Sequence, residues 1–145
     1  MQPHPRIIGF LGQALNHEYC AIQQYLTQAS LCTLWGLGDW AGSFRHEARE
    51  ELGHADLLNQ RLLRIGMAPS AGTLRPPRPG RDLDEMLRQD ADLEQAAVDL
   101  YAEAAACAAR LRDHETAALF DRLRADEEEH LRHLEGLRAG LAGRR

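Results

Sequence analysis

The sequence has few of the features that mark membrane, secreted or disulfide-bonded proteins. No apolar stretch reaches the roughly 20 residues that a membrane-spanning helix requires, so we expect no membrane segment. The N-terminus lacks a basic region followed by an apolar run and a cleavage site, which argues against secretion. The three cysteines, Cys20, Cys32 and Cys107, form no CxxC pair, and small buried thiols in a reducing cytoplasm are expected.

Aromatic residues are also scarce, at 6% of the chain, while Leu, Ala, Arg and Glu dominate. This composition favours helix over sheet at nearly every position. The net charge is −5, so the chain lacks the basic footprint of a nucleic-acid-binding protein. A length of 145 residues predicts a single domain spanning 1–145.

The chain is therefore predicted to be all-α, with four helices. Gly36 and Gly38 end the first helix, Asp39 is a candidate cap for the second, and Gly66 is a candidate C′ residue after it. Asp82 followed by Glu85 has the capping-box pattern at the start of the third helix. The expected helices cover about 7–35, 39–65, 82–111 and 115–141.

The connections between these helices predict the topology. The first and third links are short, so each should join antiparallel neighbours. The middle link, 66–81, is rich in proline and glycine, and its sixteen residues can span roughly 50 Å. A 26-residue helix is only about 39 Å long. The link can therefore cross the length of a bundle, which predicts two antiparallel pairs joined by a long crossover, the ferritin-like four-helix bundle.

The first helix is unusually poor in charge. Between Ile7 and Trp35 it contains Glu18 as its only carboxylate and no arginine. A helix with so little charge should be covered on more than one side. We therefore expect a homodimer that forms through this helix.

Two Glu-x-x-His motifs, Glu51 to His54 and Glu127 to His130, lie on the second and fourth helices. At this spacing the two side chains of a motif share one helix face and can bind one metal ion. Glu18 precedes Glu51 by 33 residues, and Glu94 precedes Glu127 by the same interval. Tyr25 and Tyr101 follow Glu18 and Glu94 by seven residues. The repeated spacing predicts a metal site made by Glu18, Glu51, His54, Glu94, Glu127 and His130.

Burial supports a pair of metal ions at this site. Glu18 has apolar and amide neighbours, and a carboxylate in a dry core is strongly destabilising without a cationic partner. Four carboxylates balance two divalent cations. Carboxylate and imidazole ligands suit iron, manganese or zinc, and the spacing does not select among the three metals.

The motifs also resemble those of a known family, the bacterioferritins. Similar runs are found in the first helix (Leu15 to Glu18 and Ala21 to Tyr25), the second helix and its end (Glu51 to Asp56, Arg61, and Gly66 to Pro69), and the fourth helix (Asp126 to His130, Leu134 and Glu135). The resemblance covers residues 5 to about 140. Ferritin-like dimetal proteins share this type of ligand set.

The resemblance implies a role for each residue of the site. Glu18 and Glu94 would be terminal ligands, Glu51 and Glu127 would bridge two iron ions, and His54 and His130 would each bind one. Tyr25 would lie beside the site as a further catalytic residue; an ordinary core tyrosine is the alternative. The implied activity is that of a ferroxidase, which oxidises Fe(II) to Fe(III) with O2 or H2O2 for iron storage or detoxification.

The sequence differs from the family pattern at two places. Family members bind haem between subunits through a methionine, and Leu52 occupies that position, so haem is not expected. The family also has a short fifth helix, and this chain ends about where that helix would begin, which leaves a dimer, a 12-subunit shell and a 24-subunit shell as alternatives. His46 and Glu50 match a possible additional iron site on the inner surface.

Two other functions fit the same pattern of residues. One is a diiron peroxidase or oxygenase of the rubrerythrin kind, although no cysteine-rich electron-transfer module accompanies the bundle. The other is a helical scaffold dimer that is stabilised by metal, such as zinc, and has no turnover.

Overall fold

The structure is a computed structural model that describes residues 3–70 and 72–144. These residues form four helices and contain no β-strand: α1 (Pro5–Leu34), α2 (Gly38–Arg64), α3 (Leu83–Arg110) and α4 (His114–Ala142). Each helix begins and ends within two residues of its expected position. The expected crossover, 66–81, includes Ala71, which lies outside the described residues, as do positions 1, 2 and 145 of the expected domain.

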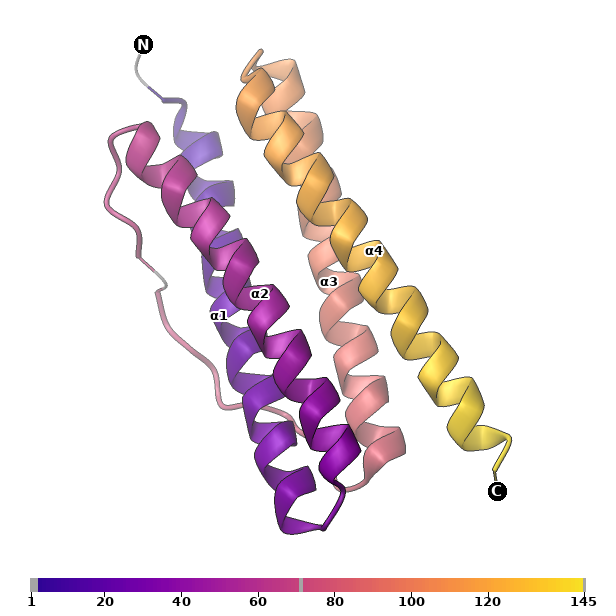
Figure 1. Cartoon of the computed structure of the whole chain (residues 1–145). Coiled ribbons are helices and arrows are strands. Elements are labelled where there is room, and N and C mark those ends of the chain that lie inside the picture. Colours follow the sequence, from indigo (N-terminus) through magenta and orange to yellow (C-terminus); the bar gives the residue numbers. More distant parts are fainter. Residues whose placement is uncertain (1–2, 71, 145) are drawn as a thin grey trace. The chain divides into compact units, whose positions relative to one another are not determined.

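The chain divides into two compact units. One unit, Leu11–Gly80, contains most of α1, all of α2 and the crossover. In this unit α1 and α2 lie side by side and antiparallel (Figure 1), because Thr33 contacts Arg45 near the turn while Glu18 contacts His54 further away from it. We call this unit the first half.

The crossover of the first half runs along α1 (Figure 1). Two α1 glutamines one turn apart hold it there. The Gln28 side-chain amide donates to the Pro79 carbonyl at 3.0 Å, and the Arg78 backbone N–H donates to Gln24 Oε1 at 3.4 Å. These bonds satisfy backbone groups in a segment whose prolines cannot form a regular ladder of their own.

The other unit contains α3 and α4, together with the N-terminal residues through Phe10. We call this unit the second half. In it α3 and α4 lie side by side (Figure 1), and they are antiparallel since Tyr101 packs on Phe120 while Glu94, earlier on α3, lies within ligand distance of Glu127, later on α4. The side chain of Asp82 accepts a hydrogen bond from Glu85 N at 2.9 Å and caps α3.

One helix start differs from the prediction. The N-cap residue of α2 is Leu37, which provides no side-chain cap, and the candidate cap Asp39 lies inside the first turn. Gly36 explains the shift, because it adopts φ +76° and the chain closes a Schellman-type turn from Leu37 N to Cys32 O. This turn leaves no extended residue before Asp39, so its carboxylate contributes only through the helix dipole.

Candidate metal centre

The first half brings one predicted set of ligands together: Glu18, Glu51 and His54. Glu18 comes from α1, and the other two share a face of α2 because they are three residues apart. His54 Nδ1 lies 3.6 Å from Glu18 Oε1 and 3.9 Å from Glu51 Oε2. The three residues each offer a ligand atom within 4.8 Å of the others, and their exposure does not exceed 4%.

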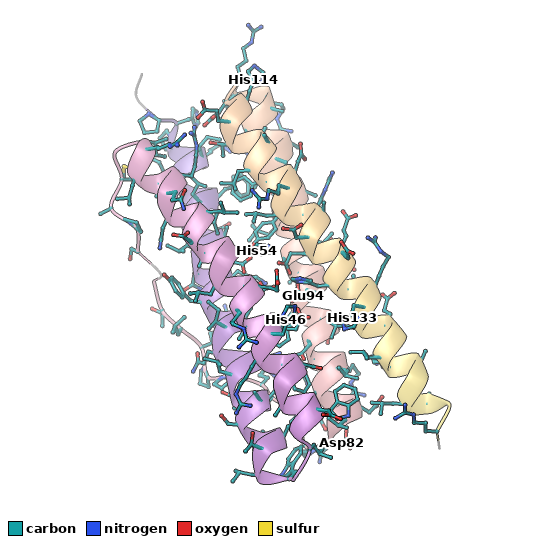
Figure 2. The ribbon with its side chains drawn as sticks, viewed as in Figure 1. His46, His54, Asp82, Glu94, His114 and His133 are labelled. Atoms are coloured by element: carbon teal, nitrogen blue, oxygen red, sulfur yellow. The ribbon has the colours of Figure 1, made fainter. Side chains whose placement is uncertain are left out.

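The second half contains a matching set: Glu94, Glu127 and His130. Glu94 lies at the middle of α3 (Figure 2), and the other two residues are three positions apart on α4. His130 Nδ1 lies 3.6 Å from Glu127 Oε2, and ligand atoms of all three residues lie within 4.8 Å of one another. Both carboxylates are buried, whereas the His130 side chain keeps 15% of its surface exposed.

The two sets are copies of one arrangement. Adding 76 to each residue number of the first set gives the second set. The relation extends to the core, because seven buried residues of α1 correspond to seven buried residues of α3 at the same offset. The positions in α1 are Leu11, Ala14, Glu18, Ala21, Tyr25, Gln28 and Cys32, and those in α3 are Leu87, Asp90, Glu94, Ala97, Tyr101, Ala104 and Ala108.

The donors in each set fit a divalent metal ion. In each set two buried carboxylates lie beside one imidazole, so within the set one positive charge at most opposes two negative charges. Buried carboxylates require a cation or several hydrogen-bond donors to offset their desolvation. Oxygen and imidazole nitrogen ligands of this kind suit iron, manganese and zinc.

The tyrosine that follows each set is fully buried in its own half. Tyr25 stacks on Phe44 with ring centroids 6.4 Å apart, and Phe44 in turn packs on Trp40 at 6.2 Å. Tyr101 packs on Phe120 at 5.7 Å. Each tyrosine therefore lies about two helical turns from the glutamate of its helix, because the two residues are seven positions apart.

The possible additional iron site lies on the surface of α2. His46 Nε2 is 3.4 Å from Glu50 Oε1, and both side chains are about half exposed or more. Figure 2 labels His46 and His54 on the same helix, two turns apart. Because the exposed pair is solvated, its interaction contributes little to stability. Leu52 occupies the position of the haem-ligating methionine in the family that this sequence resembles. Its exposed fraction is 55%.

Sequence reasoning did not predict two features near these residues. Asp90 is a fully buried carboxylate one turn before Glu94. Gln24 and Gln28 hold the crossover. The alternating three- and four-residue spacing of the α3 core could have revealed Asp90, because it places that residue on the buried face between Leu87 and Glu94.

Comparisons with known proteins agree with this fold. Residues 8–142 match the ferritin-like domain family. The chain is 37% identical to the bacterioferritin of Rhodobacter capsulatus and 36% identical to that of Brucella melitensis, in each case over 93% of this chain and 84% of the relative. A solved structure of the Rhodobacter capsulatus bacterioferritin, described with a metal-free dinuclear site and haem iron, superimposes with a TM-score of 0.92 at 36% identity. That match covers 96% of this chain and 87% of the other.

The class of the molecule is therefore a ferritin-like four-helix bundle, which confirms the predicted fold. Within this class, the chain belongs to the bacterioferritin family, a family of iron-binding and iron-storing proteins. In the described part of the chain, no helix is both long and apolar enough to cross a membrane.

Proposed function

We propose that this protein is a ferroxidase, which binds two iron ions per chain and oxidises Fe(II) to Fe(III) for iron storage or detoxification. The observation that carries this proposal is the pair of matching Glu–Glu–His sets, one in each half of the chain, whose four carboxylates are buried. The proposal includes a single domain, 1–145, in which both halves contribute to one diiron centre.

Each ligand has a proposed role. Glu18 and Glu94 would each hold one iron ion as terminal carboxylates, and Glu51 and Glu127 would be shared between the two ions. His54 and His130 complete the set with one imidazole for each ion. When bound, an iron pair of this kind transfers electrons from Fe(II) to O2 or H2O2.

The protein supplies the position and the environment of the ligands. Burial of Glu18, Glu51, Glu94 and Glu127 excludes bulk water and strengthens their attraction to a cation. The helical i, i+3 spacing holds each imidazole beside its carboxylate without the entropy cost of ordering a loop. Tyr25, buried two helical turns from Glu18, is proposed as a further catalytic residue. His46 and Glu50 are proposed as an additional iron site.

The assembly is proposed to start from a homodimer formed through α1. The exposed apolar residues of the first half support this contact, because Leu26 on α1 is 47% exposed and Leu52 on α2 is 55% exposed. Larger shells of 12 or 24 chains would enclose the cavity that a mineral store requires. A cytoplasmic location is part of the proposal. Haem binding is not part of the proposal, because leucine provides no ligand atom for haem iron.

Anaerobic addition of Fe(II), followed by air, tests the proposed function. We expect rapid oxidation of two iron ions per chain, then continued turnover and a soluble mineral core. Oxidation that stops after two ions per chain would contradict storage and favour a peroxidase or oxygenase. No oxidation at all would contradict the ferroxidase and favour a zinc-stabilised scaffold. The mass of the native particle distinguishes a dimer from a shell.

A further inference from the structure

Asp90 is a buried carboxylate that the six proposed ligands do not include. It lies on α3, one turn before Glu94, and none of its surface is exposed. Its counterpart in the first half, 76 positions earlier, is Ala14. At this position the second half therefore differs from the first, because it has an ionisable side chain in its core where the first half has alanine.

The register of α3 against α4 shows which residue faces Asp90. Tyr101 packs on Phe120, and Glu94 lies in the ligand cluster with Glu127. A step of seven residues toward the C-terminus of α3 therefore matches a step of seven residues toward the N-terminus of α4. We call each such pair of facing core residues a layer. A further layer lies between two of these, about one turn along each helix. These further layers pair Ala104 with Thr116, Ala97 with Leu123, and Asp90 with His130.

Among the α3 and α4 core residues of the adjacent layers, His130 is the side chain that can donate a hydrogen bond to Asp90. The layer on one side holds the carboxylates of Glu94 and Glu127, and the layer on the other side pairs Leu87 with Leu134. The guanidinium of Arg138 belongs to a residue eight positions beyond His130 on α4, about 12 Å along the helix axis.

The ring of His130 has one nitrogen available for this bond. Its Nδ1 lies 3.6 Å from Glu127 Oε2, on the side of the ligand cluster. The Nε2–H is then the remaining donor. Metal-binding histidines commonly donate their second N–H to a carboxylate, which fixes both the tautomer and the orientation of the ring.

We propose that Asp90 is a positioning residue, which accepts a hydrogen bond from His130 Nε2–H and holds His130 Nδ1 toward the metal position of the second half. This inference rests on the proposed diiron function. Because Ala14 offers no such acceptor to His54, the two metal positions should differ, and Asp90 should act only on the one that His130 binds.

Anaerobic titration with Co(II), followed by its visible absorption, tests this role directly. We expect Asp90→Asn to weaken one of the two binding events by about 10- to 100-fold and to leave the other unchanged. Asp92→Asn is the matched control, since it makes the same chemical change at an exposed position of the same helix, and it should leave both events unchanged. Unchanged affinities in Asp90→Asn would overturn the inference.

A double-mutant comparison identifies the histidine. The effect of Asp90→Asn should disappear when His130→Ala is already present and persist in full beside His54→Ala. An equal effect in both backgrounds would contradict the assignment to His130. If the native chain binds fewer than two Co(II) ions, the proposed diiron function fails, which is a different outcome from two sites that do not respond to Asp90.

The metal-free native chain provides a test whose decisive result does not depend on the folding of a core variant. Nitrogen-15 NMR of labelled histidines should find His130 in the tautomer with hydrogen on Nε2. Asp90→Glu, which keeps the carboxylate, should preserve this tautomer better than Asp90→Asn. A native His130 with its hydrogen on Nδ1 would overturn the inference.

Discussion

The two halves of the molecule share their proposed ligands and differ in other buried residues of the same helices. Four of the seven matched core positions of α1 and α3 are identical, including the glutamate and the tyrosine. The other three pairs differ: Ala14 with Asp90, Gln28 with Ala104, and Cys32 with Ala108. The shared positions include the glutamate that a symmetric metal pair would require, whereas one of the differences, at Gln28, occurs where the first half makes a contact of its own.

This contact of the first half is with the crossover. Gln28 is fully buried and donates to Pro79, whereas Ala104 has no comparable segment to bind in its own half. The charge distribution differs in the same way: α1 carries one carboxylate after Arg6, while α3 carries a series of acids on its exposed side. This difference in charge is the sequence feature behind the proposed subunit contact through α1.

The largest predicted effect concerns the ligands that the halves share. Glu18→Ala and Glu94→Ala should each slow the fast phase of Fe(II) oxidation by at least about 100-fold, because loss of a ligand should cost no less than loss of a supporting residue. Stopped-flow absorbance of the ferric product measures this phase. Glu103→Ala, an exposed change on α3, is the control. A large effect in only one half would show that the two sets are not equivalent.

A second prediction concerns the support of the crossover. Gln28→Leu keeps the volume of the side chain but leaves the Pro79 carbonyl without its donor, so the free energy of unfolding should fall by about 1–3 kcal/mol. Gln95→Leu is the matched control. Its amide bonds only to Asp99 one turn away, on an exposed face, and the change should be within about 0.5 kcal/mol. Chemical denaturation compares the two variants.

The helix ends provide a third prediction. Gly36 after α1 and Arg112 after α3 occupy equivalent positions, and both have positive φ, +76° and +60°. Arginine is strained in this conformation while glycine is not. Arg112→Gly should therefore raise the free energy of unfolding by about 1 kcal/mol, and Gly36→Ala should lower it by about 1 kcal/mol. Thermal unfolding that moves both variants in the same direction would contradict this explanation.

The smallest effect concerns the cysteines. Their thiols should react at different rates with an alkylating reagent, according to how deeply each is buried. Burial raises the pKa of the Cys32 thiol, so less of the reactive thiolate forms near neutral pH. Cys20 is partly exposed, whereas Cys32 and Cys107 are buried. Alkylation followed by mass spectrometry should label Cys20 first. Equal labelling of all three would indicate that the helix pairs open readily.

The sequence was sufficient to predict the repeated features of this molecule. Helix starts and ends carry local signals, such as Asp82 with Glu85, and the six candidate ligands, whose role stays a prediction, recur at one interval in both halves. Features that occur once were not predictable in the same way. Asp39 has the side chain of a cap, but the Schellman turn at Gly36 moved the helix start to Gly38. Gln24 and Gln28 are ordinary helix residues until the crossover is folded against them.

The central claim is that both halves contribute ligands to one pair of metal ions. Iron-edge anomalous diffraction from crystals soaked in Fe(II) without oxygen tests it most directly. The claim predicts two iron peaks per chain, one bound by Glu18 and His54, the other by Glu94 and His130, with Glu51 and Glu127 between them. A single peak, or two peaks that each take ligands from one half only, would contradict it.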